Sequence, residues 1–315
     1  FTFSLLLSDL EPLRDRDARK AELFYAAVAA EWRRDGWGGR AELRGKDGRF
    51  RPYFAGDVWL QSGYGFYETS VGEIRLGKIE RSFGLEDPSF GGTLFSFNGI
   101  TRNPEWGAEL AGSRRMGWNV LDWSLRYIGR NDRVAWEEDG RGVESDPDAT
   151  VRDGLEARVT YLANQGLTSL KPGISFSTAR IVRETSGPPG SSEFRRTDVA
   201  VDLTGSLGPL SAGVEAFFRE GETTDGAGTR SLRNRGAWAG LLVIRAEFPN
   251  VSYRYIYSEW RYRGADSNER EHQLAASWSP KRGIEGTLEL SARRLREAGD
   301  VRVFNAVRFG LVLAF

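Results

Sequence analysis

The fold is decided by a pattern that is clearest in residues 155–162, which read LEARVTYL. Within this stretch the polar residues Glu156, Arg158 and Thr160 alternate with apolar neighbours. Side chains of a β-strand point to opposite faces of a sheet with a period of two residues, so the stretch predicts a strand with one apolar and one polar face. The end of the chain repeats the pattern, and there the face opposite Arg308 and Gly310 carries Val307, Phe309, Leu311, Leu313 and Phe315.

Alternating segments recur from one end of the chain to the other, whereas helical periodicity is nearly absent. They predict about sixteen strands, near residues 1–8, 21–33, 39–45, 51–61, 72–80, 104–112, 117–129, 154–163, 172–183, 196–205, 209–220, 236–248, 250–262, 271–279, 284–296 and 302–315. Short turns alternate with longer polar connections at residues 9–20, 81–103, 130–153, 184–195, 221–235 and 263–270. This rhythm is typical of a membrane barrel with short periplasmic turns and long external loops. We therefore predict an all-β fold, a single closed antiparallel transmembrane β-barrel over residues 1–315.

The composition argues against several classes of function. Forty-four basic and forty-four acidic residues give no net charge, which argues against a nucleic-acid partner. The chain has no cysteine and one histidine, His272, which excludes disulfides, thiolate zinc sites and cysteine nucleophiles. Mean hydropathy is −0.46, and the longest apolar run, residues 23–30, is far shorter than the roughly 18 residues of a helical span. The first nine residues lack a basic region and a cleavage site, so we expect that an export signal has been cleaved.

Aromatic residues near the predicted strand ends favour a membrane barrel over a soluble sandwich or propeller. A soluble sheet protein buries its apolar face in a core, and its turns have roughly equal lengths. In a membrane barrel, Trp and Tyr form girdles where the outer surface meets the two lipid interfaces. The residues predicted for these girdles are Trp32, Trp106, Trp123, Tyr127, Trp238, Phe248, Tyr253, Tyr257 and Trp278.

One segment resembles the general porins of Gram-negative bacteria. Residues 72–84 read GEIRLGKIERSFG and residues 85–92 read LEDPSFGG. In that family the fifth strand ends in a similar Gly-Arg/Lys stretch and leads into a third external loop that folds into the barrel and narrows it. The resemblance implies that residues 81–103 form this constriction loop. Pro88–Gly92 is similar to the Pro-Glu-Phe-Gly-Gly of some members, although Ser89 stands where those members have a glutamate.

The resemblance also implies a pore constriction in which loop acids face basic residues of the early strands. Glu86 and Asp87 are the nearest acids, and Gly77 is expected to form a bulge that turns a lysine inward. The residues predicted for the constriction are Glu86, Asp87, Arg40, Arg44, Arg75 and Lys78. The polar faces of the strands predict further pore-lining residues, namely Arg126, Arg158, Arg254, Arg293, Arg308, Glu42, Asp57, Glu109 and Asp122.

Because acids are interleaved with these arginines, the wall favours passive diffusion of small hydrophilic solutes and ions. A substrate-selective pore for anions, phosphate or sugars stays open as an alternative. A barrel hydrolase would need His272 as its base, yet Ser277 and Ser279 fall on the opposite face, so no catalytic residue is expected. No resident cofactor is expected either, although Glu86 and Asp87 with loop carbonyls could bind Ca²⁺.

The outward positions of the early strands are small or aliphatic, which suits packing against protein. These positions are Ala26, Val28, Ala30, Ala41 and Leu43. Together with the resemblance, they predict a homotrimer in the outer membrane of a Gram-negative bacterium, in contact with lipid and lipopolysaccharide. The second external loop, near residues 46–51, is shorter than the version that latches onto a neighbouring subunit in several porins.

Overall fold

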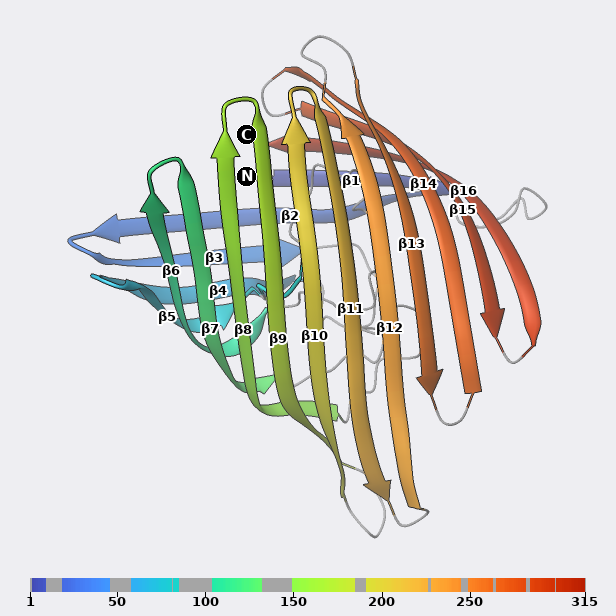
Figure 1. Cartoon of the computed structure of the whole chain (residues 1–315), viewed down its shortest axis with the longest axis horizontal. Helices are drawn as coiled ribbons and strands as arrows, with labels where there is room; N and C mark the ends of the chain where they lie inside the picture. The colour runs from blue at the N-terminus through green and yellow to red at the C-terminus, as the bar shows by residue number, and fades with distance from the viewer. Residues whose placement is uncertain are drawn as a thin grey trace.

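The computed structural model describes residues 2–9, 19–45, 58–80, 82–84, 104–131, 149–184, 191–225, 228–244, 249–262, 265–281, 284–297 and 299–314. These residues form β-strands and the turns between them (Figure 1). The strands are β1 (Thr2–Asp9), β2 (Arg19–Arg34), β3 (Trp37–Gly45), β4 (Val58–Thr69), β5 (Gly72–Ile79), β6 (Glu105–Met116), β7 (Asn119–Asn131), β8 (Ala149–Gln165), β9 (Thr168–Glu184), β10 (Ser191–Leu207), β11 (Leu210–Asp225), β12 (Gly228–Val243), β13 (Asn250–Tyr262), β14 (Ala265–Lys281), β15 (Ile284–Glu297) and β16 (Asp300–Ala314). No helix in the described ranges is long and apolar enough to cross a membrane.

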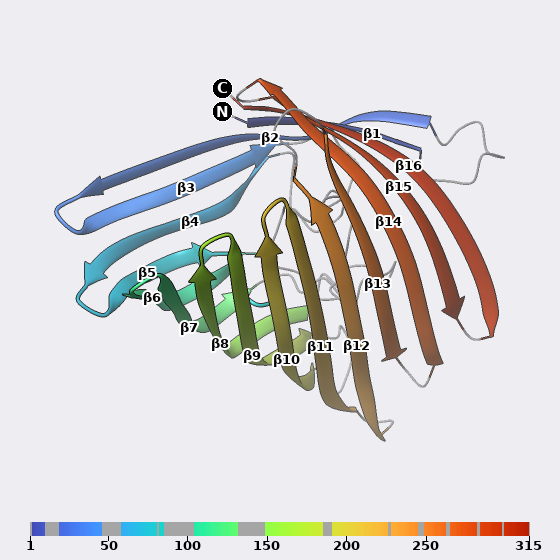
Figure 2. The ribbon, with the colours of Figure 1, turned by 45° about the horizontal axis from the view of Figure 1, so that its top comes forward.

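Every strand pairs antiparallel with its neighbours along the chain, so the predicted all-β antiparallel fold is confirmed. β1 pairs with β2 on one side and with β16 on the other, and the sixteen strands of the described residues thereby form a closed ring. The two ends of the chain lie side by side, as Figure 2 shows. The turns at residues 35–36, 70–71, 117–118, 166–167 and 208–209 join consecutive strands at one end of the barrel, here called the short-turn end.

The two faces of the sheet have the opposite polarity to that of a soluble protein. Leu125 of β7 and Val159 of β8 are exposed on the outer surface. Arg126 of β7 and Glu156 of β8 face the barrel interior, where each is only 1% exposed. The same contrast runs through β10 and β11, where exposed Val201 and Val214 accompany buried acids on the opposite face. A sandwich or propeller would bury the apolar face instead. The chain therefore presents its apolar side chains to the surroundings and its charged side chains to the barrel interior.

Most of the predicted girdle residues that the structure describes lie on the outer surface. Trp32, Trp106, Tyr127 and Tyr253 are exposed there, and Trp278 packs against Phe309 with ring centroids 5.9 Å apart. The side chain of Trp238 is not among those that the structure describes. Phe248 lies outside the described residues.

Several predicted strand limits are wrong. Only residues 226–227 separate β11 from β12, and only residues 263–264 separate β13 from β14, so the long connections expected at 221–235 and 263–270 are mostly strand. Polar residues occupy both faces of these strand ends, which removes the alternation while leaving the hydrogen-bonded ladder intact. β4 extends to Thr69 rather than ending near residue 61, because Gly63 and Gly65 interrupt the apolar pattern on its outer face, and its predicted start near residue 51 lies outside the described residues.

The register of β15 with its two neighbours can be tested on the outer face of the barrel. Leu290 of β15 pairs with exposed Leu274 and Val307, so it sits inside a continuous apolar surface. Leu290→Arg should lower the free energy of unfolding in lipid by roughly 2–4 kcal/mol, because it places a guanidinium in hydrocarbon. Leu290→Phe keeps the surface apolar and should change it little. Urea denaturation in lipid vesicles measures both, and equal midpoints for the two variants would show that the register is wrong.

Candidate functional site

The chain leaving β5 enters the barrel and runs along its inner wall. The Ser82 hydroxyl lies 2.8 Å from the Ser124 hydroxyl of β7, and the Ser82 amide donates to the Glu156 carboxylate of β8 over 3.3 Å. The Gly84 amide donates to the Ser175 hydroxyl of β9 over 3.1 Å. Residues 82–84 therefore cross the inner faces of three successive strands, and they do so through hydrogen bonds to side chains of the wall.

Phe83 anchors this segment on the next two strands. Its side chain is 2% exposed and packs in a buried cluster with Ala200 of β10 and Phe217 of β11. Gly84 has a backbone φ of +74°, and a Cβ atom there would lie 2.7 Å from the Glu215 carboxylate. Only glycine fits this close approach in that conformation. Residues 82–84 thus form one docked unit, here called the docking segment.

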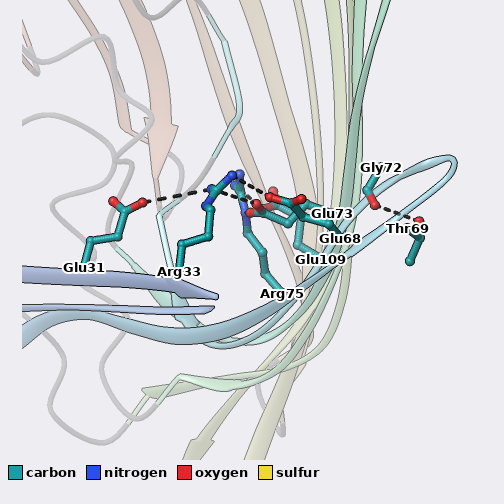
Figure 3. Close-up of polar contacts among 8 residues, drawn as sticks. All are labelled: Glu31, Arg33, Glu68, Thr69, Gly72, Glu73, Arg75 and Glu109. Carbon is teal, nitrogen blue, oxygen red and sulfur yellow. Dashed lines mark hydrogen bonds and ion pairs between the residues drawn. The ribbon is translucent and has the colours of Figure 1, made fainter. Parts of the chain in front are cut away.

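An ion-pair chain lies on the inner wall near the short-turn end (Figure 3). Arg33 of β2 contacts Glu68 of β4 at 2.5 Å and Glu73 of β5 at 3.4 Å. Arg75 contacts Glu73 at 2.6 Å and Glu109 of β6 at 2.9 Å. Figure 3 shows these side chains from four strands pointing toward one another inside the barrel.

This cluster of ion pairs contains more carboxylates than guanidinium groups. Glu31 lies 4.0 Å from Arg33 and joins Glu68, Glu73 and Glu109, so these six residues contain four carboxylates and two guanidiniums. The difference, four minus two, is an excess of two carboxylates within the cluster. Both guanidiniums are therefore fully compensated by neighbours on the wall.

Arg126 of β7 and Arg158 of β8 are compensated as well. Arg126 is buried and donates to the Glu105 carboxylate over 2.8 Å and to the Glu80 carbonyl oxygen over 2.6 Å. Arg158 forms two hydrogen bonds with Asp202 of β10, at 2.7 and 3.1 Å, and a third with Ser175. A guanidinium held by a carboxylate in this geometry is fixed in orientation and has little charge left to attract a distant anion.

Between the docking segment and the short-turn end, the barrel interior holds an open recess of about 670 Å³. Arg75, Arg158 and Lys171 face it together with Glu68, Glu73 and Asp122, so its charges are balanced. Hydroxyl groups supply much of the remaining lining, from Thr69, Ser82, Ser113, Ser124, Thr160 and Thr204. The recess can accommodate water and small hydrophilic solutes.

No family model matches the chain, and no curated protein matches it. Solved structures do match over the whole chain. OmpT of Vibrio cholerae, an outer membrane protein in a trimer form, has 14% identity and a TM-score of 0.65, with 100% of this chain and 98% of that chain covered. The outer membrane channel DcaP of Acinetobacter baumannii has 9% identity and a TM-score of 0.69, with 100% and 95% covered. The anion-selective porin from Comamonas acidovorans has 12% identity and a TM-score of 0.63, with 100% and 99% covered.

The chain has the porin fold. Within this fold the structure brings together some of the predicted site residues. Arg75 and Glu109 are in contact, and Arg40 lies 3.9 Å from Glu42 on the inner face of β3. Asp122 lies 4.0 Å from Lys171 at the recess. Arg254 is buried and donates to Gln273 of β14 over 3.0 Å.

The prediction for Lys78 is wrong. The ladders of β5 with β4 and with β6 continue through Gly77 without a shift, so no bulge turns Lys78 inward. Lys78 pairs with exposed Trp106 on the outer face, and its Nζ donates to the Leu60 carbonyl over 2.6 Å. A Cβ at Gly77 would lie 2.3 Å from the Gly63 carbonyl oxygen, and its φ is +141°. This glycine permits close strand approach rather than a bulge.

Other predicted residues are only partly described. Arg293 lies half-buried on β15, whereas the side chains of Arg44 and Arg308 are not described. Glu86, Asp87 and Asp57 lie outside the described residues, so the acids of the constriction and the Ca²⁺ site stay predictions. In the part of the chain that the structure describes, no group of three or more His, Cys, Asp or Glu side chains could hold a metal ion.

Three residues of the site were not predicted from the sequence, namely Arg33, Glu68 and Phe83. A signal for the first was present, because Glu31 and Arg33 alternate with Trp32 and therefore share the face opposite that tryptophan. Glu68 fell outside the predicted limits of its strand. Phe83 gave no signal of its own, because its partners Ala200 and Phe217 are more than a hundred residues away in sequence.

Proposed function

We propose that this chain is a porin that lets small hydrophilic solutes and ions diffuse passively across the outer membrane. The observation that carries the proposal is the polarity of the barrel, whose charged inner wall surrounds an open recess while its outer surface is apolar. A barrel of this kind places water inside and hydrocarbon outside. No reaction and no cofactor is required for that function.

In this proposal residues 81–103 form the constriction. The docking segment supports it, because Ser82, Phe83 and Gly84 carry the chain inward from β5 to the wall formed by β7–β11. A loop that starts on the inner wall narrows the passage, whereas an ordinary external loop would leave the barrel mouth. The acids Glu86 and Asp87 follow directly after the docking segment.

The wall supports a general pore over an anion-selective one. Arg75, Arg126 and Arg158 each contact a carboxylate within 3 Å, so they do not form an uncompensated arginine ladder. The net field at the constriction then depends on the loop acids. A ladder that selects phosphate or other anions would need free guanidiniums.

The position of His272 supports a channel over a hydrolase. Its imidazole is exposed on the outer surface, and Nδ1 lies 2.7 Å from the Tyr253 hydroxyl. The only imidazole of the chain thus faces away from the pore, where it cannot serve as a base for a substrate in the lumen.

We also propose that the protein is exported with a cleaved signal, assembles as a homotrimer and contacts lipid and lipopolysaccharide. The outward side chains of β2 and β3 support a protein interface, because Val28, Ala30, Ala41 and Leu43 form an exposed surface of small and aliphatic residues.

The proposal is tested by recording from the purified chain in planar bilayers under a salt gradient. We expect stepwise, steady conductance with a reversal potential between those of ideal cation and ideal anion selectivity. A folded barrel that gives no conductance would overturn the proposal.

The constriction is tested in the same recordings. Glu86→Gln combined with Asp87→Asn should move the reversal potential toward anion permeability, and the change should shrink as salt screens the charges. Asp35→Asn is the control, because it removes an exposed carboxylate at the β2–β3 turn of the short-turn end. If the double variant keeps the wild-type reversal potential at low ionic strength, these acids do not line the constriction.

A further inference from the structure

Three neighbouring hairpins expose apolar side chains at their tips. Trp118 at the β6–β7 turn is 86% exposed, and Leu167 at the β8–β9 turn is 81% exposed. Leu207, where β10 ends, is 63% exposed. Short turns that project into water normally carry small and polar residues, so tips of this kind need a partner.

Hydrogen bonds between the hairpins hold these tips in one row. The Asn164 side chain donates to the Trp118 carbonyl over 3.2 Å, and the Asn164 amide donates to the Asn119 side chain over 3.1 Å. The Gly208 amide donates to the Leu167 carbonyl over 3.1 Å. Figure 1 shows the three turns side by side along one edge of the barrel. We call this row, with Trp118, Leu167, Leu207 and the adjoining Leu210, the apolar rim.

On β9, β10 and β11 the apolar rim adjoins the outer apolar surface. On β9, exposed Leu170 and Ile174 lie on the strand that leads away from Leu167. On β10 and β11, Leu203 and Val214 do the same beside Leu207 and Leu210. The surface that faces hydrocarbon therefore extends to the ends of the strands in this sector.

Arg114 gives the sector below the rim a positive charge on its outer face. It is exposed, and it pairs with Leu121 on the outer face of β6 and β7, four residues before Trp118 and therefore farther from the turn. Its long side chain can extend toward the turn, so that the guanidinium meets lipid phosphate while the stem lies on the apolar surface.

The tip of the β2–β3 hairpin has a different character. Arg34 and Asp35 form an ion pair there, and both side chains are 86% exposed. Charged tips of this kind remain in water. The turn residues of the β6–β11 hairpins are therefore apolar or glycine, whereas the β2–β3 turn carries Asp35 next to exposed Trp37.

We propose that the apolar rim lies in the phospholipid headgroup layer, so that the β6–β11 hairpins end within the membrane while the β2–β3 hairpin ends in water. The partner is the lipid surface itself, and the barrel is seated unevenly at its short-turn end. The inference rests on the proposed membrane location of the barrel and goes beyond it, because a porin can conduct with or without such a rim.

The natural absence of cysteine allows a direct depth measurement. Trp118→Cys and Leu167→Cys are labelled with an environment-sensitive fluorophore and reconstituted in vesicles of phosphatidylethanolamine and phosphatidylglycerol. Arg34→Cys and Lys281→Cys are the controls, since both are exposed charged residues at or beside short turns. A nitroxide on the lipid headgroup and aqueous iodide serve as the two quenchers.

We expect the rim labels to be quenched by the lipid nitroxide about fivefold more, and by iodide about fivefold less, than the control labels. Rim labels that are as accessible to iodide as the controls would overturn the rim. Channel recordings on the same labelled samples separate the two proposals. If the protein conducts while its rim labels are exposed to water, the location of the rim in the headgroup layer is rejected and the proposed porin function is not. Leu207→Cys provides a third label if either rim variant fails to fold.

Discussion

Phe83→Ala should release the docking segment from the pore wall and raise the single-channel conductance. The side chain is buried against Ala200 and Phe217, and removing a buried phenylalanine costs about 3–5 kcal/mol. A loss of that size changes the ratio of docked to released segment by roughly two to four powers of ten. The strand ladders do not involve Phe83, so the barrel should still fold, and its free energy of unfolding should fall by no more than the docked segment contributes. Conductance and its fluctuations in planar bilayers measure the effect.

Phe218→Ala is the matched control, because Phe218 is exposed on the outer face one position from Phe217. It should leave conductance unchanged. Phe217→Ala should reproduce the effect of Phe83→Ala, and the double variant should add little, since both changes break the same contact. Normal conductance in a folded Phe83→Ala protein would mean that the docking segment does not limit the pore.

The strands could be predicted from the sequence because charged and apolar residues alternate clearly wherever one face of the sheet is charged. Glu156 and Arg158 could be assigned to a common face from LEARVTYL alone, and they lie on the inner wall. The alternation disappears where polar residues occupy both sets of alternating positions, as at the ends of β11 to β14. It also disappears where glycine replaces the apolar residue, as in β4.

For the site, the sequence predicts which face of the sheet each side chain lies on, but it does not predict which side chains are in contact. Arg75 and Glu109 face the same way by alternation, but their contact depends on the register between β5 and β6, which the sequence does not state. Lys78 was misplaced because a glycine in a strand serves either a bulge or a close backbone approach, and only coordinates separate the two. The partners of Phe83 come from strands far along the chain, so no local pattern signals them.

Arg126→Met should destabilise the barrel more than any change on its surface. Arg126 is fully buried between Glu105, 2.8 Å away, and Glu156, 4.0 Å away. Methionine fills a similar volume but leaves carboxylates buried without this positive charge, which costs about 3–5 kcal/mol. Urea denaturation in lipid vesicles, followed by tryptophan fluorescence, measures the loss. Arg34→Met is the control, and breaking its exposed pair with Asp35 should cost less than about 1 kcal/mol.

A second substitution separates loss of charge from loss of packing. Adding Glu105→Gln to Arg126→Met removes the nearest buried negative charge, so the double variant should recover a substantial part of the lost stability. If packing alone mattered, the double variant would be no more stable than the single one. Arg126 also donates to the Glu80 carbonyl, at the point where the chain leaves β5 for the docking segment. The double variant should therefore still conduct abnormally after its stability has recovered, because the hydrogen bond that fixes this exit is absent from it. Recovery of both properties together would contradict a role for Arg126 in placing the docking segment.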